Sequence, residues 1–550
     1  MLIKKKDLCM ATDLYIERFA IPTKGIDDNE DNLDINLKKH IAKELKIDED
    51  NILDYKIIQK SIDSRKKGSL LIIYKLILTV NTIDNIIEEN PNISTKLPED
   101  TTDILNSLNL TTNKPETTIV VGAGPAGLLA AYLLVKNGVK VTLIDRGYDV
   151  EKRKEDINNF LNTRELNTES NFINGEGGAG TFSDGKLYTR IKNPRAKWIL
   201  ELFVAMGAPE EIIYLSHPHV GSDKLVDVVS NIRKEIIKLG GNVLWGTKVV
   251  DTIQSGNNCI GVKLDSGEEL KADKVILAMG HSSRSLIKQL VSNGVEHQLK
   301  NFQIGTRIEH PQIFINRMRY GLRNTPKYLK PAEYNLVSRP NPKHNIANVT
   351  TFCMCPGGEV VPATSHANLL STNGMSYYDR AGEFANSALI VNQEVDNYKS
   401  AEEAFQFIEK IEHKCFKAGG EDYTAPTQSA EGFIEKYRHI YREESSYALG
   451  TKEARIDYLF PKRTVKAIAE SLRYFDKIAP GFIGCGMLIG AETRISSPVR
   501  FLRDKETAQT SIENLYIAGE GGGFAGGIIS AALDGLKIAE LILTETYIKK

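Results

Sequence analysis

Several signatures are missing from this 550-residue sequence, and each absence excludes a class of protein. No apolar run reaches the roughly 18 residues that a membrane-spanning helix needs, and the start, MLIKKKDLCMATD, lacks the apolar stretch of a signal peptide. Positive charge is not in excess, because the formal net charge is −1. DNA and acidic lipid surfaces are therefore not expected as partners, and we expect a soluble, cytoplasmic protein.

Cysteine is also scarce, with six residues and no CxxC pair. This excludes a disulfide framework, a zinc ribbon and a thioredoxin-reductase-type disulfide relay, and no metal site is expected. Cys353 and Cys355 lie two apart on an expected strand, where side chains share a face. They could form a redox pair, but buried core cysteines are the favoured interpretation.

The clearest positive signal runs from Thr118 to Gly147. A short β-branched strand, Ile119 to Val121, leads into the glycine turn GAGPAG, which must contain the start of a helix. A second strand, Lys140 to Ile144, then delivers Asp145 eighteen residues after Gly127. This order predicts a dinucleotide site with phosphate at the helix N-terminus and ribose at the acid, and it leaves open whether the ligand is NAD or FAD.

Two later strands repeat part of this pattern. Residues 272–280 form an expected buried strand that ends at Gly280, and residues 514–534 read as strand, glycine cluster and helix with an acid, Glu520. An NAD dehydrogenase does not need this late unit, whereas FAD is long enough to reach it. Glu520 could then bind a ribityl hydroxyl, while the helix from Gly526 directs N–H groups at the flavin. No second GxGxxG is present, so a dedicated NAD(P)H domain is not expected.

The remaining sequence predicts an α/β protein of several parts. Residues 1–84 read as a small N-terminal βαββ, ferredoxin-like module with a basic turn at Arg65 to Lys67, and residues 85–115 as a linker. The turn could be a docking patch, but a solvated tip is the favoured interpretation. Residues 116–295 and 490–550 would form a Rossmann-like FAD-binding domain with a β-meander over 242–264, interrupted by an inserted α+β substrate or cap domain over 296–489.

A glycine-rich block, NGEGGAGTFSDGKLYTR, extends from Asn174 to Arg190. Its glycines, hydroxyls and Lys186 could approach a flat or anionic ligand closely. Phe182 and Leu187 within it indicate a packed loop, and packed glycine-rich loops tend to be functional.

Taken together, the motifs GAGPAG, IDRG, ESNFINGEGGAGTFSDGKLYTRI, ILAMGHSSR, FQIGTRIEHPQ, FCMCPGGEVVPA, ETRISSPVRFLRD and LYIAGEGGGFAGGI resemble the bacterial FAD-dependent dehydrogenase family, also called NAD(FAD)-utilising dehydrogenases, within the glutathione-reductase-like flavoproteins. The likeness covers nearly the whole chain. It implies FAD held by Gly122, Gly124, Gly127, Asp145, Gly280, Gly519 and Glu520. Glu520 departs from the Asp usual at this place in the wider superfamily.

The expected site therefore has two sets of residues. Cofactor contacts are expected from Gly122, Gly124, Pro125, Ala126, Gly127, Asp145, Arg146, Gly177, Gly178, Ala179, Gly180, Thr181, Ser183, Lys186, Val249, Ala278, Gly280, Gly519, Glu520, Gly526, Gly527 and Ile528. Catalytic candidates, which would polarise a substrate or move a proton, are Arg190, Arg307, His310, Tyr378, Arg380 and Arg494.

The expected function is hydride transfer between flavin N5 and an organic substrate that the sequence does not name. NAD(P)H or a protein could donate the electrons, and the oligomeric state is open. The alternative is a non-catalytic, sensing or RNA-modifying flavoprotein that uses the N-terminal module to bind a partner.

Overall fold

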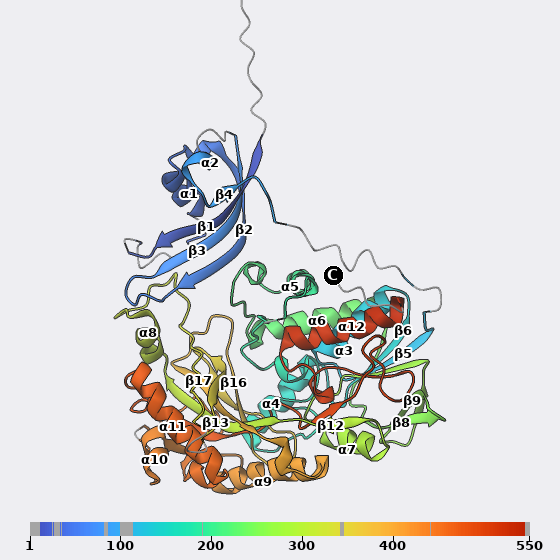
Figure 1. Ribbon diagram of the computed structural model, residues 1–550. Helices are drawn as coiled ribbons and strands as arrows, with labels where there is room; N and C mark the ends of the chain where they lie inside the picture. Colours follow the sequence, from blue (N-terminus) through green and yellow to red (C-terminus); the bar gives the residue numbers. More distant parts are fainter. Residues whose placement is uncertain are drawn as a thin grey trace, which may run out of the picture.

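A computed structural model describes residues 11–24, 26, 33–34, 36–81, 86–98, 110, 114–189, 191–341, 346–440 and 442–544. Figure 1 shows the N-terminal module above the inserted domain, with the FAD-binding domain beside the inserted domain. The expected Rossmann-like parallel sheet is confirmed. Its strand order is β22-β11-β5-β6-β7, formed by Leu515–Ile517, Lys274–Leu277, Thr117–Val121, Lys140–Ile144 and Asn242–Leu244.

The strands of this sheet are apolar on both sides, so both faces of the sheet must be covered. Helices cover one of the two faces. The helices α3 (Pro125–Lys136), α5 (Arg195–Ala205), α6 (Ser222–Lys238) and α12 (Ile528–Thr544) share a core with it. The opposite face packs on β8 (Val249–Ser255), β9 (Asn258–Leu264) and α7 (Arg284–Ser292). The connection from β5 leads to β6 on one side, and β11 lies on the other, so a crevice forms at the carboxyl end of β5.

The expected meander over 242–264 is partly wrong. Residues Asn242–Leu244 form β7, which pairs in parallel with β6 of the main sheet. The long amphipathic helix α6 immediately precedes β7, so α6 serves as the crossover that a parallel strand requires. Only β8, β9 and β10 (Glu269–Lys271) form the separate antiparallel sheet.

The inserted domain contains a six-stranded sheet in the order β14-β17-β13-β20-β18-β19. These strands are Val349–Cys355, Phe384–Gln393, Phe302–Pro311, Met487–Glu492, Ala425–Ser429 and Thr451–Glu453. The helices α9 (Ala401–Gly419), α10 (Ala430–Glu435) and α11 (Lys462–Ile478) share its core. Because β20 pairs with β13, this domain extends past the expected boundary at residue 489.

Short elements link the two domains. The strands β12 (His297–Leu299) and β21 (Val499–Phe501) pair with each other, as do β15 (Glu359–Pro362) and β16 (Thr372–Met375). The helices α4 (Val150–Thr163) and α8 (Gln312–Tyr320) follow β6 and β13.

The N-terminal module is an antiparallel sheet in the order β2-β3-β1-β4, the split β-α-β arrangement of ferredoxin-like folds. Its elements are β1 (Thr12–Pro22), α1 (Leu37–Leu45), β2 (Ile52–Asp63), β3 (Leu71–Val80), α2 (Ile86–Glu89) and β4 (Ile93–Ser94). The strand β4 lies inside the expected linker, so the module extends further than the sequence suggested. Its hairpin tip contacts α8, because the Gly68 N–H donates to the Tyr320 carbonyl at 2.7 Å.

Candidate functional site

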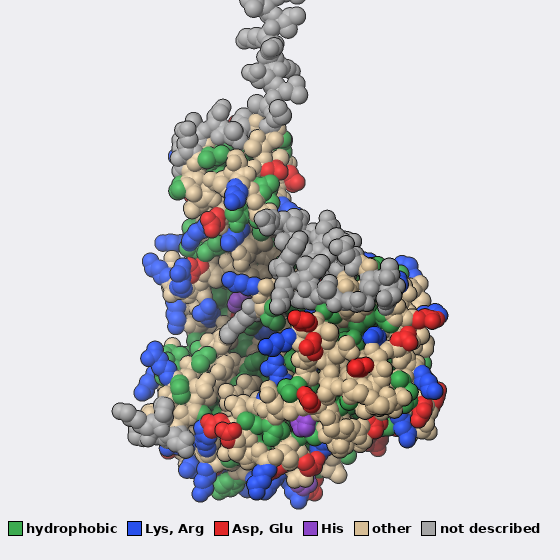
Figure 2. Space-filling model, turned by 45° about the vertical axis from the view of Figure 1, so that its right-hand side comes forward, with side chains coloured by type: hydrophobic (Ala, Val, Ile, Leu, Met, Phe, Trp, Pro, Cys, Tyr) green, Lys and Arg blue, Asp and Glu red, His purple; other side chains and the backbone are tan. Residues whose placement is uncertain are grey.

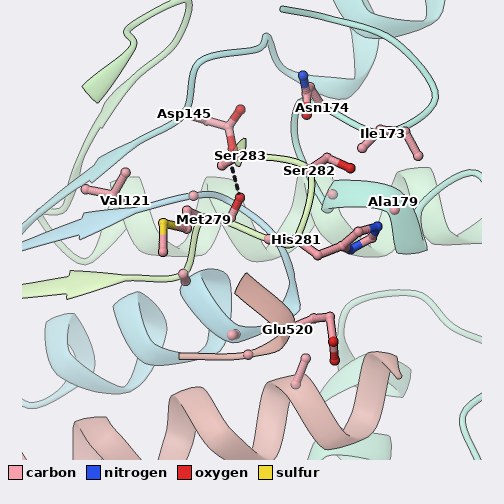
Figure 3. A pocket seen from close by; sticks show the side chains of 18 of the residues that line it. Val121, Asp145, Ile173, Asn174, Ala179, Met279, His281, Ser282, Ser283 and Glu520 are labelled. Atoms are coloured by element: carbon pink, nitrogen blue, oxygen red, sulfur yellow. Dashed lines mark hydrogen bonds between the residues drawn. The ribbon is translucent and has the colours of Figure 1, made fainter. Parts of the chain in front are cut away.

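An elongated pocket lies at the carboxyl ends of β5, β6, β11 and β22 (Figure 3). Its walls come from six segments of the chain, within residues 121–126, 144–146, 173–180, 247–249, 278–286 and 518–531, and the helices α3 and α12 both begin at it. In Figure 3, Asp145 and Glu520 lie well apart, with the Met279–Ser283 segment between them in the view. A pocket of this shape fits a long ligand with two differently anchored ends.

Most of the expected cofactor residues line this pocket. They are Gly122, Gly124, Pro125, Ala126, Asp145, Arg146, Gly178, Ala179, Gly180, Val249, Ala278, Gly280, Gly519, Glu520, Gly526, Gly527 and Ile528. Sequence reasoning missed several further lining residues, among them Ile173, Asn174, Thr247, Lys248 and Ser282. For His281 the position after Gly280 suggested either a place facing the cofactor or a helix cap, and His281 lines the pocket. His281 and Ser282 directly follow Gly280, so the end of that strand was the available signal.

The glycine turn is shaped by close backbone contacts. A Cβ on Gly122, whose φ is +101°, would lie 2.3 Å from the Ala278 carbonyl oxygen, and one on Gly127 would lie 1.8 Å from the Gly122 carbonyl oxygen. Gly124 differs, because a Cβ there would meet nothing within 4 Å. Gly124 precedes α3, so the open space in front of it adjoins a helix N-terminus with unpaired N–H groups. This geometry fits a phosphate group of a dinucleotide.

Asp145 organises the turn with both carboxylate oxygens. One accepts a hydrogen bond from the Ala123 N–H and the other from the Gly147 N–H, each at 2.8 Å. Burial raises the pKa of this carboxyl group, although the two N–H donors oppose the rise. Each oxygen retains a second lone pair, so the expected contact with a ribose hydroxyl is compatible with these bonds and stays a prediction.

Glu520 lies at the other end of the pocket. Its Oε1 accepts a hydrogen bond from the Ser497 N–H at 2.9 Å and lies 3.4 Å from Lys300 Nζ. Its Oε2 lies 3.1 Å from the place that a Cβ on Gly526 would occupy. No hydrogen bond within the described chain engages Oε2, so this oxygen can accept one from a ligand hydroxyl. A side chain at Gly526 would therefore press against the Glu520 carboxylate at the start of α12.

Five expected cofactor residues do not line the pocket. Gly127 permits close backbone packing, and Gly177 leaves room for the Thr181 side chain. Thr181 donates to the Glu176 carbonyl at 3.0 Å, and Ser183 donates to the Gly180 carbonyl at 2.7 Å. The fifth residue, Lys186, forms an ion pair with Asp184 at 2.8 Å. The glycine-rich block therefore contacts the pocket at Gly175 to Gly180, and its later half faces elsewhere.

The structure does not bring all five described catalytic candidates into one place. Arg190 lies outside the described residues. His310 is buried in the core of the inserted domain, where Nε2 bonds to the Phe482 carbonyl at 2.9 Å and burial lowers its pKa to about 4. A histidine enclosed in this way supports the fold, and nothing in its surroundings connects it to the pocket.

Arg494 is the candidate nearest to the pocket. Its guanidinium donates to Ser282 Oγ at 3.2 Å and to Ser365 Oγ at 2.6 Å. Glu412 lies between Arg494 and Arg284, with closest nitrogen to oxygen distances of 3.3 and 2.7 Å. Ser282 lines the pocket, so Arg494 contributes to the pocket wall through its hydrogen bond to Ser282 Oγ.

Arg307 and Arg380 each hold an acidic partner, and the charges of both arginines act on the buried Cys355 thiol. Arg307 lies 2.7 Å from Glu492 and donates to the Cys353 carbonyl at 2.8 Å. Arg380, whose φ is +53°, forms a two-point ion pair with Asp184 at 3.0 and 2.6 Å. Tyr378 donates to Glu211 at 2.9 Å and its ring stacks on His219. Sequence reasoning missed the acids of these pairs.

The two neighbouring cysteines differ in their surroundings. Cys355 is buried, which raises the pKa of its thiol, whereas Cys353 is exposed, so the expected buried position is confirmed for Cys355 and wrong for Cys353. The Cys355 thiol donates to the Cys353 carbonyl at 3.3 Å. Their redox role stays a prediction. Throughout the described ranges, no group of three or more His, Cys, Asp or Glu side chains could hold a metal ion, and no helix is long and apolar enough to cross a membrane.

Comparison with known proteins finds a matching family model for each of the two large parts of the chain. Residues 116–312 match the pyridine nucleotide-disulphide oxidoreductase family model, and residues 301–495 match the model of the C-terminal domain of FAD-dependent proteins. Residues 25–79 match a domain of unknown function. A Clostridium beijerinckii protein, described as uncharacterized, is 37% identical over 528 residues, which cover 95% of this chain and 98% of that protein.

Solved flavoprotein structures are more distant. The L-proline dehydrogenase from P. horikoshii is 12% identical, with a TM-score of 0.34, and the match covers 79% of this chain and 95% of that one. CtdE in complex with FAD is 12% identical, with a TM-score of 0.32, and covers 78% and 86%. The family models and the pocket agree with each other, and the chain belongs to the FAD-dependent oxidoreductase family.

Proposed function

We propose that this protein is a cytoplasmic FAD-dependent oxidoreductase that transfers a hydride between flavin N5 and an organic substrate. The observation that carries the proposal is a single pocket with two anchored ends, the glycine turn with Asp145 at one and Glu520 with the start of α12 at the other. NAD would need only the first end. FAD has a second polar chain and a ring that require the second.

Different residues of the chain would hold different parts of the cofactor. Gly124 and the N-terminus of α3 would hold the pyrophosphate, and Asp145 with Lys248 would lie at the adenosine end. Glu520 Oε2 would accept from a ribityl hydroxyl, while the first N–H groups of α12 would face the ring edge on which negative charge develops. FAD, when bound, would supply or accept the hydride.

The source of electrons is open in this proposal. No second glycine fingerprint accompanies the pocket, so NAD(P)H would have to bind without a domain of its own, or a protein would have to deliver the electrons. None of the described residues of the N-terminal module belongs to the pocket lining, which runs from Val121 to Ala531.

Purified protein should be yellow, and denaturation should release a flavin that co-migrates with FAD. Anaerobic titration with NADH, NADPH and dithionite then identifies the donor, because only a competent donor bleaches the flavin absorbance at a rate that saturates. A colourless protein that stays without flavin after incubation with FAD would contradict the proposal.

A further inference from the structure

One side chain in the wall of the cofactor pocket has a nitrogen without a partner. His281 directly follows Gly280 after β11, and its Nε2 atom is buried with no hydrogen bond to any described residue. Of the buried side-chain atoms in this condition within the described ranges, only this one belongs to a residue that lines the pocket. Buried polar atoms in folded proteins are usually paired, so a ligand atom is the expected partner of Nε2.

The other ring nitrogen determines what Nε2 can do. The imidazole forms a hydrogen bond with the Arg494 backbone that raises its pKa, so the Nδ1–H donates to the Arg494 carbonyl. Burial and the charges of Arg494 and Arg284 nevertheless lower the pKa of His281 to about 3, with Glu412 opposing them. The ring is therefore neutral near neutral pH. With its proton on Nδ1, the imidazole offers a lone pair at Nε2 and can only accept there.

Contacts from both domains fix the segment that carries His281. Ser283 Oγ donates to the Met279 carbonyl at 2.6 Å, a bond drawn in Figure 3. Arg494, which follows β20 of the inserted sheet, donates to Ser282 Oγ at 3.2 Å. Figure 2 shows the inserted domain and the FAD-binding domain side by side, with the surface hollowed between them. The position of the imidazole is thus set by the protein and not by a ligand.

His281 lies at the Glu520 end of the pocket. The strands β11 and β22 are neighbours in the parallel sheet, and a Cβ on Gly521 would lie 2.7 Å from the Gly280 carbonyl oxygen. The residues that follow the two strands are therefore in contact. In the view of Figure 3, the imidazole lies closer to Glu520 than to Asp145. A neutral acceptor at this place lies beside the carboxylate that would bind the ribityl chain.

The chemistry of Nε2 selects among the groups of the cofactor. A lone pair attracts hydroxyl donors, and the ribityl chain of FAD carries several hydroxyls in a row, so neighbouring acceptors on the protein can bind neighbouring hydroxyls. The N1 and O2 atoms of the flavin ring are acceptors themselves, and the lone pair would repel them. A phosphate is excluded for the same reason, because the neutral ring has no proton to donate from Nε2.

We infer that His281 is a cofactor-binding residue whose Nε2 accepts a hydrogen bond from a ribityl hydroxyl next to the one that Glu520 binds. This rests on the proposed function. The ribityl chain is then held by one charged and one neutral acceptor. The neutral acceptor adds no negative charge beside a ring that becomes anionic on reduction, whereas a second carboxylate would oppose that charge.

Binding is tested with FAD and with ADP, which has the adenosine and the pyrophosphate but no ribityl chain. In titrations of flavin-free protein, His281→Leu should weaken FAD binding about tenfold and leave ADP binding within about twofold. His281→Gln, whose amide oxygen can take the place of Nε2, should weaken FAD binding less than about threefold. His413→Leu is the matched control, at an exposed histidine whose Nδ1 lies 3.3 Å from the Asn368 carbonyl, and should change neither ligand.

Nitrogen-15 NMR of histidine-labelled protein tests the same bond without a substitution. Near neutral pH the His281 ring should be neutral with its proton on Nδ1, because its pKa lies near 3. Addition of FAD should shift the Nε2 signal upfield, as an unprotonated imidazole nitrogen does when it accepts a hydrogen bond, and addition of ADP should leave it in place. The spectrum of His281→Gln, which lacks this signal, provides the assignment.

Wild-type protein that binds no FAD contradicts the proposed function. If the wild type binds FAD and His281→Leu binds it equally well, the inference alone is overturned. Equal losses of FAD and ADP binding in His281→Leu would show that His281 supports the pocket as a whole, which overturns the assignment to the ribityl chain. A protonated ring, a proton on Nε2, or an Nε2 signal that FAD does not move overturns it as well.

Discussion

Glu520 is the residue on which the orientation of the cofactor depends. Its Oε1 is held by the Ser497 N–H, so the carboxylate has a fixed position before any ligand arrives. We predict that Glu520→Ala weakens FAD binding about tenfold to a hundredfold, because one charge-assisted hydrogen bond of about 1.5–3 kcal/mol is lost. The dissociation constant can be measured by quenching of flavin fluorescence when FAD is added to the flavin-free protein.

Lys300→Met provides the matched control, since Lys300 lies 3.4 Å from Glu520 but does not line the pocket. It should weaken FAD binding less than Glu520→Ala does. If Glu520→Ala binds FAD as the wild type does, the strand and glycines that precede α12 are structural and the proposed orientation is wrong.

Glu412 is a buried carboxylate between two guanidinium groups. Burial would raise its pKa, but the charges of Arg284 and Arg494 hold the pKa far below its ordinary value. We predict that Glu412→Gln costs about 3–5 kcal/mol of stability, because two buried cations lose their shared partner. Urea unfolding at neutral pH measures this loss. Glu470→Gln, in an exposed pair with Arg473, should have no measurable effect.

The same carboxylate predicts a direction for acid unfolding. Its pKa is lower in the folded than in the unfolded protein, so the stabilisation is complete above about pH 4.3, the ordinary glutamate value, and decreases as pH falls further. Unfolding midpoints measured between neutral pH and pH 3 should therefore drop more steeply for the wild type than for Glu412→Gln. Parallel curves would show that Glu412 titrates normally.

Among the larger elements, α12 and α3 cross so closely that one position tolerates only glycine. A Cβ on Gly535 would lie 2.0 Å from the Ala126 carbonyl oxygen, in the first turn of α3. We predict that Gly535→Ala displaces α12, lowers stability by about 1–3 kcal/mol and reduces bound FAD, since both helices begin at the pocket. Thermal unfolding and flavin content measure the two effects.

Gly484→Ala is the control for this helix contact, because a Cβ at Gly484 would lie 3.9 Å from its nearest neighbour, an ordinary contact. The control should retain FAD and stability. If Gly535→Ala also retains both, the two helices have room to separate, and the helix contact does not position the glycine turn.

Elements with a strong local pattern could be predicted from the sequence, and contacts between distant segments could not. The order of strand, glycine turn and helix around Gly124 is written in consecutive residues, so its place in the pocket was foreseeable. The bond from the Ala123 N–H to Asp145 depends on how two loops meet. His217 and Glu333 are 116 residues apart in different domains, and only the folded inserted sheet brings them together.

The N-terminal module is attached to the rest of the molecule through the segment before His217. The edge of β2 pairs with the segment before His217, because the Lys60 N–H donates to the Tyr214 carbonyl at 2.7 Å and the Ser216 N–H donates to the Lys60 carbonyl at 2.9 Å. Gln59 adds a side-chain bond to Ser216 at 2.9 Å. The module thus holds the backbone from which His217 projects.

We predict that deleting residues 1–112 leaves FAD bound, because no described residue of the module lines the cofactor pocket, while the segment before His217 loses its strand partner. The deletion also removes Leu70, which belongs to the core of the inserted domain, so the thermal midpoint should fall. In the full chain, Gln59→Ala should lower the thermal midpoint slightly because it removes the bond to Ser216, and Lys56→Ala, exposed on the same strand, should not. Thermal unfolding and flavin content measure the two effects. Loss of FAD on deletion would show that the module supports the whole molecule, whereas an unchanged thermal midpoint would show that the segment before His217 keeps its place without the module.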